Sequence, residues 1–177
     1  MAASGLAAPI VTISEAQAYV RVETGEEEAL LAGLIRTASG LCEAFLRQVV
    51  IARDFSVQVA AGSRWERLDV GPVISITSVE AVDSSGIAPL LPSSSYAMDI
   101  DSSGDGWVRV TDAGGHARVR VSGTAGMAQG ENDVPEPIRQ GVLRLVAHLF
   151  TTRDGDGGEP PAAVTALWRP YRRMRLA

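Results

Sequence analysis

Three aspartates lie in a short acidic turn near the middle of the chain, and their type and spacing could bind a divalent cation. Asp99, Asp101 and Asp105, followed by Gly106, resemble the first half of a calcium-binding loop, in which carboxylate oxygens ligate the ion. Such a loop needs a bidentate acid at its twelfth position, and that position here is Val110. The pattern therefore favours a solvated hairpin turn, with an incidental calcium site as the alternative.

Groups suited to acid-base or nucleophilic chemistry are few. His116 and His148 are the candidate general bases, and Cys42 is the single cysteine. Because His148 lies in an apolar stretch, packing or capping of a neighbour is its favoured role. These residues cannot assemble a Cys/His zinc site, and the sequence has no phosphate-binding glycine loop or Gly-x-Ser-x-Gly elbow. We therefore expect no enzyme activity, metal or cofactor, with an enzyme of dispersed active-site residues as the weaker alternative.

A second distinctive set of side chains, cationic and aromatic, lies at the carboxy terminus. Three interpretations of it are open: a solvated tail, a segment that docks on a protein partner, and contact with a nucleic-acid backbone. The chain has a formal net charge of -5 and a pI near 5.0, which argues against broad nucleic-acid affinity and favours docking. The candidate docking residues are Trp168, Arg169, Tyr171, Arg172, Arg173 and Arg175.

Composition sets the limits within which these residues act. With 177 residues, 46% of them hydrophobic and 21% charged, the chain is long enough for one globular domain with a core. All 16 basic residues are arginine. GC-rich codon usage is the favoured explanation, and selection for guanidinium-carboxylate pairing is the second. Because no leader and no apolar run of membrane-spanning length is evident, we expect a protein of cytosolic origin that is neither secreted by a signal peptide nor embedded in a membrane.

Two helices are expected near the amino terminus, after a flexible arm at 1–10. Hydroxyls of Thr12 and Ser14, followed by Glu15, predict the start of a short helix at 13–22. Thr24 and Glu27 have capping-box spacing, which predicts a long helix at 25–47.

The long helix has two adjacent apolar stripes. Such a wide apolar face predicts burial on more than one side, with packing inside the domain favoured over packing against a neighbouring subunit. One stripe contains Leu30, Leu34, Ala38, Leu41 and Phe45, and the other contains Leu31, Ile35, Cys42 and Leu46.

An antiparallel β region is expected at 54–122, where apolar residues alternate with polar ones. Short strands separated by small polar turns favour a β-sandwich or a meander, because a parallel sheet would need helical crossovers. After this region, Pro135 and Pro137 predict the start of a helix at 135–152. A Gly/Pro-rich hinge then opens the 154–177 segment, so removal of the residues after Glu159 is expected to leave the fold intact. The fold class is therefore α+β: helices from both ends of the 11–153 domain pack as a small helical bundle, and an antiparallel β region, a sandwich or a meander, is inserted between them in the sequence.

The order of these parts resembles the head-tail connector proteins of long-tailed phages, prophages and gene transfer agents, over residues 12–171. The matching segments, in chain order, are Ala18-Tyr-Val-Arg21, Leu41-Cys-Glu43-Ala-Phe45, the strands around Leu68 to Val79, Tyr96 to Asp99, Val119 to Gly126, Val134-Pro-Glu-Pro-Ile138, and Ala147-His-Leu-Phe-Thr-Thr-Arg153.

The resemblance implies a structural virion protein located in the neck, between head and tail. Such an adaptor, also called a head completion protein, forms a ring, commonly of twelve subunits, on the portal after DNA packaging. It extends the DNA channel, without sequence-specific DNA binding, and joins the head to the stopper or tail. For this chain it implies assembly in the bacterial cytoplasm, with the carboxy-terminal docking residues reaching the portal and the β-region loops facing the next tail component.

A different function remains open from the residues alone. Trp65 and Trp107 could belong to a tail or baseplate module that recognises another virion protein or a glycan. Their alternating strand positions favour packing within or at the edge of the core over such recognition.

Overall fold

The computed structural model of the chain describes residues 8–22, 25, 27–83, 89–152 and 160–173. Its contacts divide the chain into two compact units. We call Ala52–Met127 the β unit, and Leu6–Ile51 together with Ala128–Ala177 the helical unit. The range 11–153, expected as a single domain, is divided between these units.

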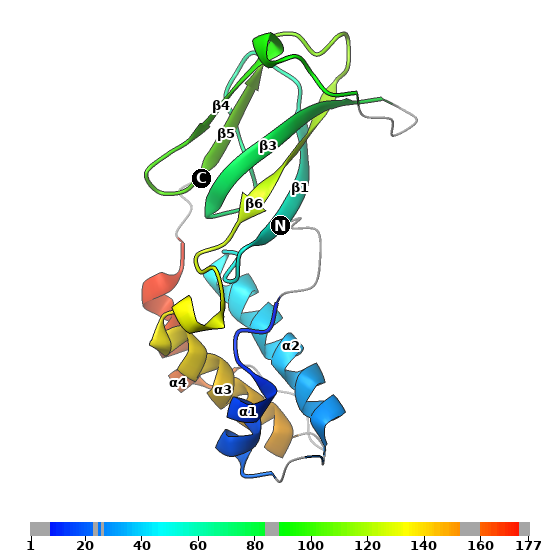
Figure 1. Cartoon of the computed structure of the whole chain (residues 1–177). Coiled ribbons are helices and arrows are strands. Elements are labelled where there is room, and N and C mark those ends of the chain that lie inside the picture. Colours follow the sequence, from blue (N-terminus) through cyan, green and yellow to red (C-terminus); the bar gives the residue numbers. More distant parts are fainter. Residues whose placement is uncertain (1–7, 23–24, 26, 84–88, 153–159, 174–177) are drawn as a thin grey trace. The chain divides into compact units, whose positions relative to one another are not determined.

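Helices from both ends of the sequence form the helical unit (Figure 1). They are α1 (Ile13–Val20), α2 (Glu28–Leu46), α3 (Glu136–Thr151) and α4 (Ala162–Trp168), with 3-10 turns at Glu131–Asp133 and Arg169–Tyr171. The first three correspond to the ranges 13–22, 25–47 and 135–152 expected from the sequence. In this unit α3 packs against each of the other three helices.

Local interactions fix where α1 and α2 begin and end. Thr12 and Glu15 form a capping box at the start of α1, in which each side chain bonds the other residue's backbone N–H. Arg21 and Arg47 end α1 and α2 in the left-handed conformation, with φ of 60° and 57°. Glu27 is the N-cap residue of α2. The expected capping partner Thr24 lies outside the described residues.

The two apolar stripes of α2 are buried to different extents: the Leu31 stripe lies in the core, whereas the Leu30 stripe is fully buried only at Ala38. Leu31 and Ile35 are buried, as are Ala38, Cys42 and Leu46, and this face packs against α3. In contrast, Leu30 and Leu41 of the other stripe are 38% and 41% exposed. The expectation that packing inside the domain buries both stripes is therefore wrong for these two leucines.

The composition of α2 is predominantly apolar, although Glu28, Arg36 and Glu43 lie within it. By length and composition the helix is long and apolar enough to cross a membrane, which corrects the expectation that the sequence has no such segment. A core helix of a globular protein meets the same condition, and the buried stripe of α2 is of this kind.

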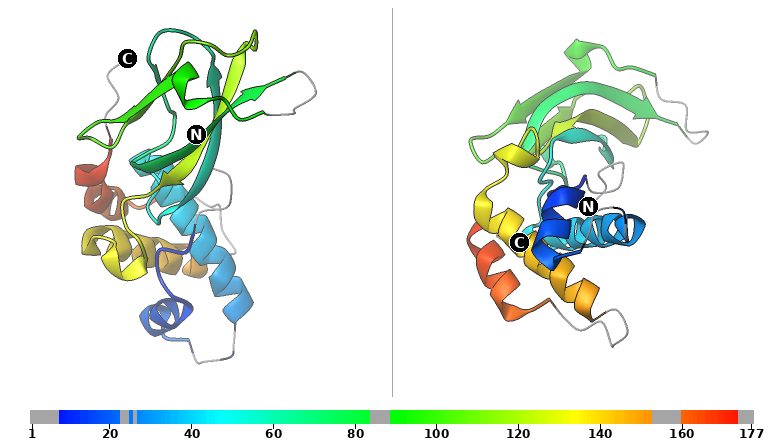
Figure 2. Two further views of the ribbon diagram at one scale, coloured as in Figure 1. Left: turned by 45° about the horizontal axis from the view of Figure 1, so that its top comes forward. Right: turned by 60° about the horizontal axis from the view of Figure 1, so that its bottom comes forward.

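The β unit consists of two three-stranded antiparallel sheets. The first has the order β1-β6-β3, formed by Arg53–Ala60, Arg118–Ala125 and Val73–Val82. The second has the order β2-β5-β4, formed by Glu66–Arg67, Gly106–Val110 and Tyr96–Ile100. Figure 2 shows the two sheets from two further directions. This arrangement confirms the expected α+β class with an inserted antiparallel region.

Alternating side chains from both sheets form the core of the β unit. Val119 and Val121 of β6 are fully buried, and each pairs with an inward-facing residue of β1 and of β3. Next to them in β6, a Cβ on Gly123 would overlap the carbonyl oxygen of Ser75, so only glycine fits between the strands there. The other buried apolar residues of this unit are Phe55, Val57, Leu68, Val70, Val73, Val79, Ala81, Leu91, Val108, Val110 and Ala125.

Candidate functional site

The carboxy-terminal segment folds onto the helical unit. Its helix α4 starts where the Pro161 carbonyl accepts hydrogen bonds from the N–H groups of Val164 and Thr165, and it packs against α3. Val164 is 1% exposed. The segment therefore contributes to the core, which corrects the expectation that the residues after Glu159 can be removed without harm to the fold.

Trp168 is the largest fully buried side chain of the described residues. Its indole N–H donates a 3.2 Å hydrogen bond to the Ile138 carbonyl, and its ring fills the space left by Gly141. This hydrogen bond satisfies the polar atom of a side chain that is 0% exposed. Trp168 is therefore a core residue that holds the segment in place, which corrects its expected position on an exposed docking surface.

Aromatic and cationic contacts connect the end of α4 to α2. The rings of Phe45 and Trp168 lie 5.8 Å apart at an angle of 52°. The guanidinium carbon of Arg172 lies 5.3 Å from the centre of the Phe45 ring, within the range of a cation-π interaction. Phe45 is therefore in contact with both the buried and the exposed part of the segment.

Two hydrogen bonds attach the last described residues to the end of α2. The side-chain nitrogen of Gln48 donates to the Tyr171 carbonyl at 2.6 Å, and the Arg173 N–H donates to the Leu46 carbonyl at 3.1 Å. The first bond involves a Gln48 side chain that is 7% exposed. These bonds fix the backbone from which the arginine side chains extend.

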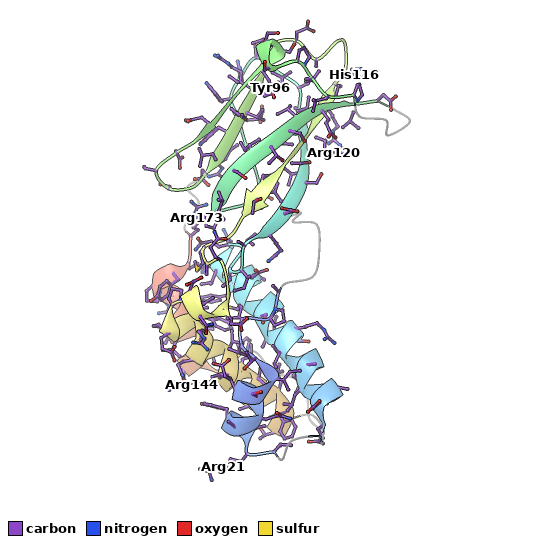
Figure 3. The ribbon with its side chains drawn as sticks, in the orientation of Figure 1. Arg21, Tyr96, His116, Arg120, Arg144 and Arg173 are labelled. Atoms are coloured by element: carbon purple, nitrogen blue, oxygen red, sulfur yellow. The ribbon has the colours of Figure 1, made fainter. Side chains whose placement is uncertain are left out.

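The other docking residues lie at or near the surface. Arg169 and Arg172 are exposed, and Tyr171 and Arg173 are half-buried. Figure 3 labels Arg173, which follows α4 and the last 3-10 turn. Arg175 lies outside the described residues. We call Arg169, Tyr171, Arg172 and Arg173 the arginine surface, and no acidic residue occurs in the sequence from 160 to its end.

The acidic turn of the β unit, by contrast, is a hydrogen-bonded hairpin. One carboxylate oxygen of Asp101 accepts from the N–H groups of Ser103 and Asp105 at 2.9 and 3.0 Å. The other accepts from the indole N–H of Trp107 at 3.1 Å. The same carboxylate that would be a metal ligand thus closes the turn between β4 and β5. Among the described residues no group of three or more His, Cys, Asp or Glu side chains could hold a metal ion.

Trp65 lies on the surface of the β unit. It is 43% exposed, and the guanidinium carbon of Arg109 lies 5.0 Å from its ring centre. An exposed tryptophan beside an arginine is a composition typical of protein interfaces. Trp107 is half-buried and anchored to the acidic turn, so its ring has a structural role.

The remaining candidates for chemistry belong to different units or are buried. His116 belongs to the β unit and His148 to α3 of the helical unit. Burial raises the pKa of the Cys42 thiol, and the neighbouring Glu43 carboxylate adds to the effect. Since a thiol reacts as the thiolate, Cys42 is not suited to be a nucleophile.

Sequence reasoning missed two residues that position the arginine surface. Gly141 leaves room for the Trp168 ring, and Gln48 holds the Tyr171 carbonyl. A glycine inside an otherwise apolar helix is the one available signal, because glycine disfavours helix and needs a reason there. Nothing in the sequence marks Gln48, whose partner is 123 residues away.

Solved structures with the same fold were found by comparison. One is a chain from the neck of an empty gene transfer agent particle computed with C6 symmetry, at a TM-score of 0.76 and 23% identity. Another is from the neck of a native particle computed with C12 symmetry, at 0.74 and 19%. Each likeness covers 100% of this chain and 96% of the other.

A third structure, the virion of a native gene transfer agent particle, gives a TM-score of 0.71 at 23% identity over 100% of this chain and 95% of the other. No protein-family model and no curated protein matches the sequence. Since the likeness extends over both units, the whole chain has the fold of proteins found in gene transfer agent particles.

Proposed function

We propose that this protein is a non-enzymatic structural virion protein of the neck, a head-tail adaptor of a gene transfer agent or a long-tailed phage. Its subunits form a ring on the portal, extend the DNA channel and join the head to the stopper or tail. The observation that supports this most is the likeness in fold to neck chains of gene transfer agent particles, which covers this chain entirely and nearly all of theirs.

The symmetry named for the similar chains favours a ring. The necks that contain them were computed with C6 and C12 symmetry. A twelve-subunit ring is compatible with both symmetries. Such a ring closes through a heterologous interface, in which one face of a subunit binds a different face of the next.

The arginine surface is our candidate contact with the portal, together with Arg175. Arginine and tyrosine are enriched among residues that dominate binding energy at interfaces. The segment is attached to the helical core through Trp168, Gln48 and Leu46, so little chain entropy is lost when it binds. An acidic partner surface would complement its positive charge.

Electron microscopy tests this proposal directly. The full chain would be mixed with the portal ring encoded by a neighbouring gene, and the complex imaged. A symmetric collar on the portal is the expected result. If both proteins are folded and no collar forms, the adaptor assignment is wrong.

Variants can then test the arginine surface itself. We expect Arg169→Glu with Arg172→Glu to weaken portal binding by at least tenfold, because attraction becomes repulsion across the interface. The matched control is Arg64→Glu with Arg118→Glu, two exposed arginines of the β unit. Equal losses from both pairs would show that net charge, rather than the arginine surface, determines binding.

The alternative function is a tail or baseplate module that recognises another virion protein or a glycan. The exposed Trp65 ring beside Arg109 is the observation that favours it. Under the adaptor assignment, this pair is a candidate contact with the next tail component. Binding of a glycan array by the wild type, lost in Trp65→Ala, would support the module instead.

A further inference from the structure

The solvent-facing side of α2 has fewer charged and polar residues than a surface helix normally carries. We call this side the outer face of α2. Its residues are exposed or half-exposed, and the charged residues beside them are Arg36 and, at the end of the helix, Arg47. Surface helices of globular proteins usually have charged and polar residues opposite the buried stripe, whereas a helix that is apolar all round is normally buried. The outer face comprises Leu30, Gly33, Thr37, Gly40, Leu41 and Ala44.

No contact among the described residues requires glycine at the two glycine positions of the outer face. A Cβ on Gly33 or Gly40 would meet no atom within 4 Å. In contrast, a Cβ on Gly141 would overlap Trp168, so that glycine is required by packing. Glycine is among the least favourable residues for a helix interior, and alanine would therefore be preferred at positions 33 and 40 of an isolated subunit. Space at these two positions allows another backbone to approach α2 closely.

The exposed leucines extend this surface along the helix. Leu30 and Leu41 lie three turns apart on the same side of α2, with the small residues between them. Apolar side chains in such a row form a ridge that packs into the groove of another helix, and small residues shorten the distance between the helix axes. The outer face thus has the features of a helix-packing surface with no partner among the described residues of the subunit.

We propose that a second copy of this chain covers the outer face of α2, through the helical unit of the neighbouring subunit. This inference rests on the proposed function, because a ring places identical subunits side by side. The neck structures of similar chains were computed with C6 and C12 symmetry, which favours a copy of the same chain as the occupant.

The neighbour's contacting surface lies on its α4. A heterologous ring needs a second face on the opposite side of the subunit. Figures 1 and 2 show α3 between most of α2 and α4, which contact each other at the carboxy-terminal end of α2 through Phe45 and Trp168. The exposed residues of α4 are Ala162, Ala163 and Ala166, which are also small. The α2 of one subunit therefore packs on the α4 of the next, with small residues on both sides.

Disulfide cross-linking of the full chain tests this contact. Thr37→Cys and Ala163→Cys would be combined in one chain and oxidised with copper phenanthroline at high protein concentration. Because Cys42 is fully buried, it contributes no background. The expected result is a ladder of dimers, trimers and larger species on a denaturing gel. The control combines Thr37→Cys with Ser93→Cys, an exposed position of the β unit, and should give no ladder.

Two other results would overturn the proposal. Cross-linking of the test pair no greater than that of the control would exclude the α2–α4 contact. Dimers from Thr37→Cys alone, with nothing larger from the pair, would show that two α2 helices meet face to face and that the contact cannot propagate around a ring.

A membrane is the other surface that an apolar helix can enter, and flotation tests it. The wild-type chain would be mixed with vesicles of phosphatidylcholine and phosphatidylglycerol and centrifuged through a density gradient. We expect the protein to stay at the bottom. Flotation that is abolished by Leu41→Glu would show that lipid, not a second copy, covers the outer face.

Substitution of the glycines provides a second readout. Gly33→Leu combined with Gly40→Leu should leave the isolated subunit folded, because a Cβ at either position would meet open space and leucine is a better helix former than glycine. In the cross-linking background, the same change should reduce the ladder at least tenfold. An undiminished ladder would show that close approach at α2 is not needed.

The outcomes distinguish this inference from the adaptor function. A ladder without a collar on the portal would retain the subunit contact and reject the portal attachment. A collar whose subunits do not cross-link through Thr37→Cys and Ala163→Cys would retain the adaptor function and reject the contact.

Discussion

Gly141 and Trp168 occupy complementary positions in the helical unit: the indole ring lies where a side chain on residue 141 would begin. The ring is held there by its hydrogen bond to the Ile138 carbonyl, three residues before Gly141 on α3. Because the Trp168 backbone leads directly into Arg169, this packing determines where the arginine surface starts. Gly141 of α3 thereby controls the position of the arginine surface, which follows α4.

The first prediction is that Gly141→Ala destabilises the helical unit. A Cβ at this position overlaps the Trp168 ring, and overpacking of this kind costs about 1–3 kcal/mol. Urea unfolding followed by tryptophan fluorescence would measure the loss. The matched control is Gly33→Ala, which has open space and should stabilise α2 by about 0.5–1 kcal/mol through helix propensity. Stabilisation by both changes would contradict the packing described here.

Trp168→Ala tests whether the carboxy-terminal segment belongs to the core. Removal of a fully buried tryptophan should cost about 3–5 kcal/mol in free energy of unfolding. Leu167→Ala, one residue earlier and half-buried, should cost distinctly less. Thermal unfolding of the two variants gives the comparison. A variant Trp168→Ala as stable as the wild type would restore the interpretation of the segment as a separable tail.

The helices and strands were predictable because their signals are local. The Thr12–Glu15 capping box, the proline start of α3 and the alternation in β1 and β6 each depend on residues close in sequence. These signals were sufficient for the α+β class. They do not show which apolar residues of α2 face the core, because both stripes have helical periodicity and burial depends on where α3 packs.

The candidate site was less predictable for a related reason. Trp168 occurs among arginines, and local composition therefore indicated a solvated or docking segment. Its burial depends on the space at Gly141 and on Phe45, which are distant in sequence. Local reading identifies the residue types of the arginine surface, but long-range packing determines which of them are exposed.

A pH dependence of stability is expected from Glu15. Partial burial alone raises the pKa of this carboxyl, but hydrogen bonds from the Thr12 N–H and hydroxyl, together with Arg139, outweigh it and leave the pKa below its usual value. The native state therefore favours the carboxylate. Its stabilisation is present above the unfolded-state pKa of about 4.3 and is lost as pH falls through the lower pKa of the folded state.

Glu15→Gln checks this sign. The wild type should be more stable than the variant near pH 7, and the difference should shrink below about pH 4 as the wild-type carboxylate is protonated. Urea midpoints measured at a series of pH values would show the convergence. Glu136→Gln is a suitable control, because this carboxylate is more exposed and lies 3.6 Å from the same arginine. A difference that grows at low pH would refute the assignment.

Asp101→Ala is expected to weaken the β4–β5 hairpin without any effect on ion binding. The change removes the acceptor of two backbone N–H groups and of the Trp107 indole, at a cost of about 1–3 kcal/mol. It should also shift the tryptophan fluorescence. Millimolar calcium should leave the thermal midpoint of the wild type unchanged. A calcium-dependent rise that Asp101→Ala abolishes would revive the metal site.

A pair of charged substitutions distinguishes the core from the outer face of α2. Leu145 is 1% exposed, so Leu145→Asp would bury a carboxylate without a partner and should cost at least about 4 kcal/mol, enough to unfold a marginally stable unit. Leu41 is 41% exposed, so Leu41→Asp leaves its charge in water and the isolated subunit should remain folded. Circular dichroism of the two variants would separate the cases. Unfolding by Leu41→Asp would place the outer face of α2 inside the subunit, whereas a folded Leu145→Asp protein would mean that α3 does not form the core described here.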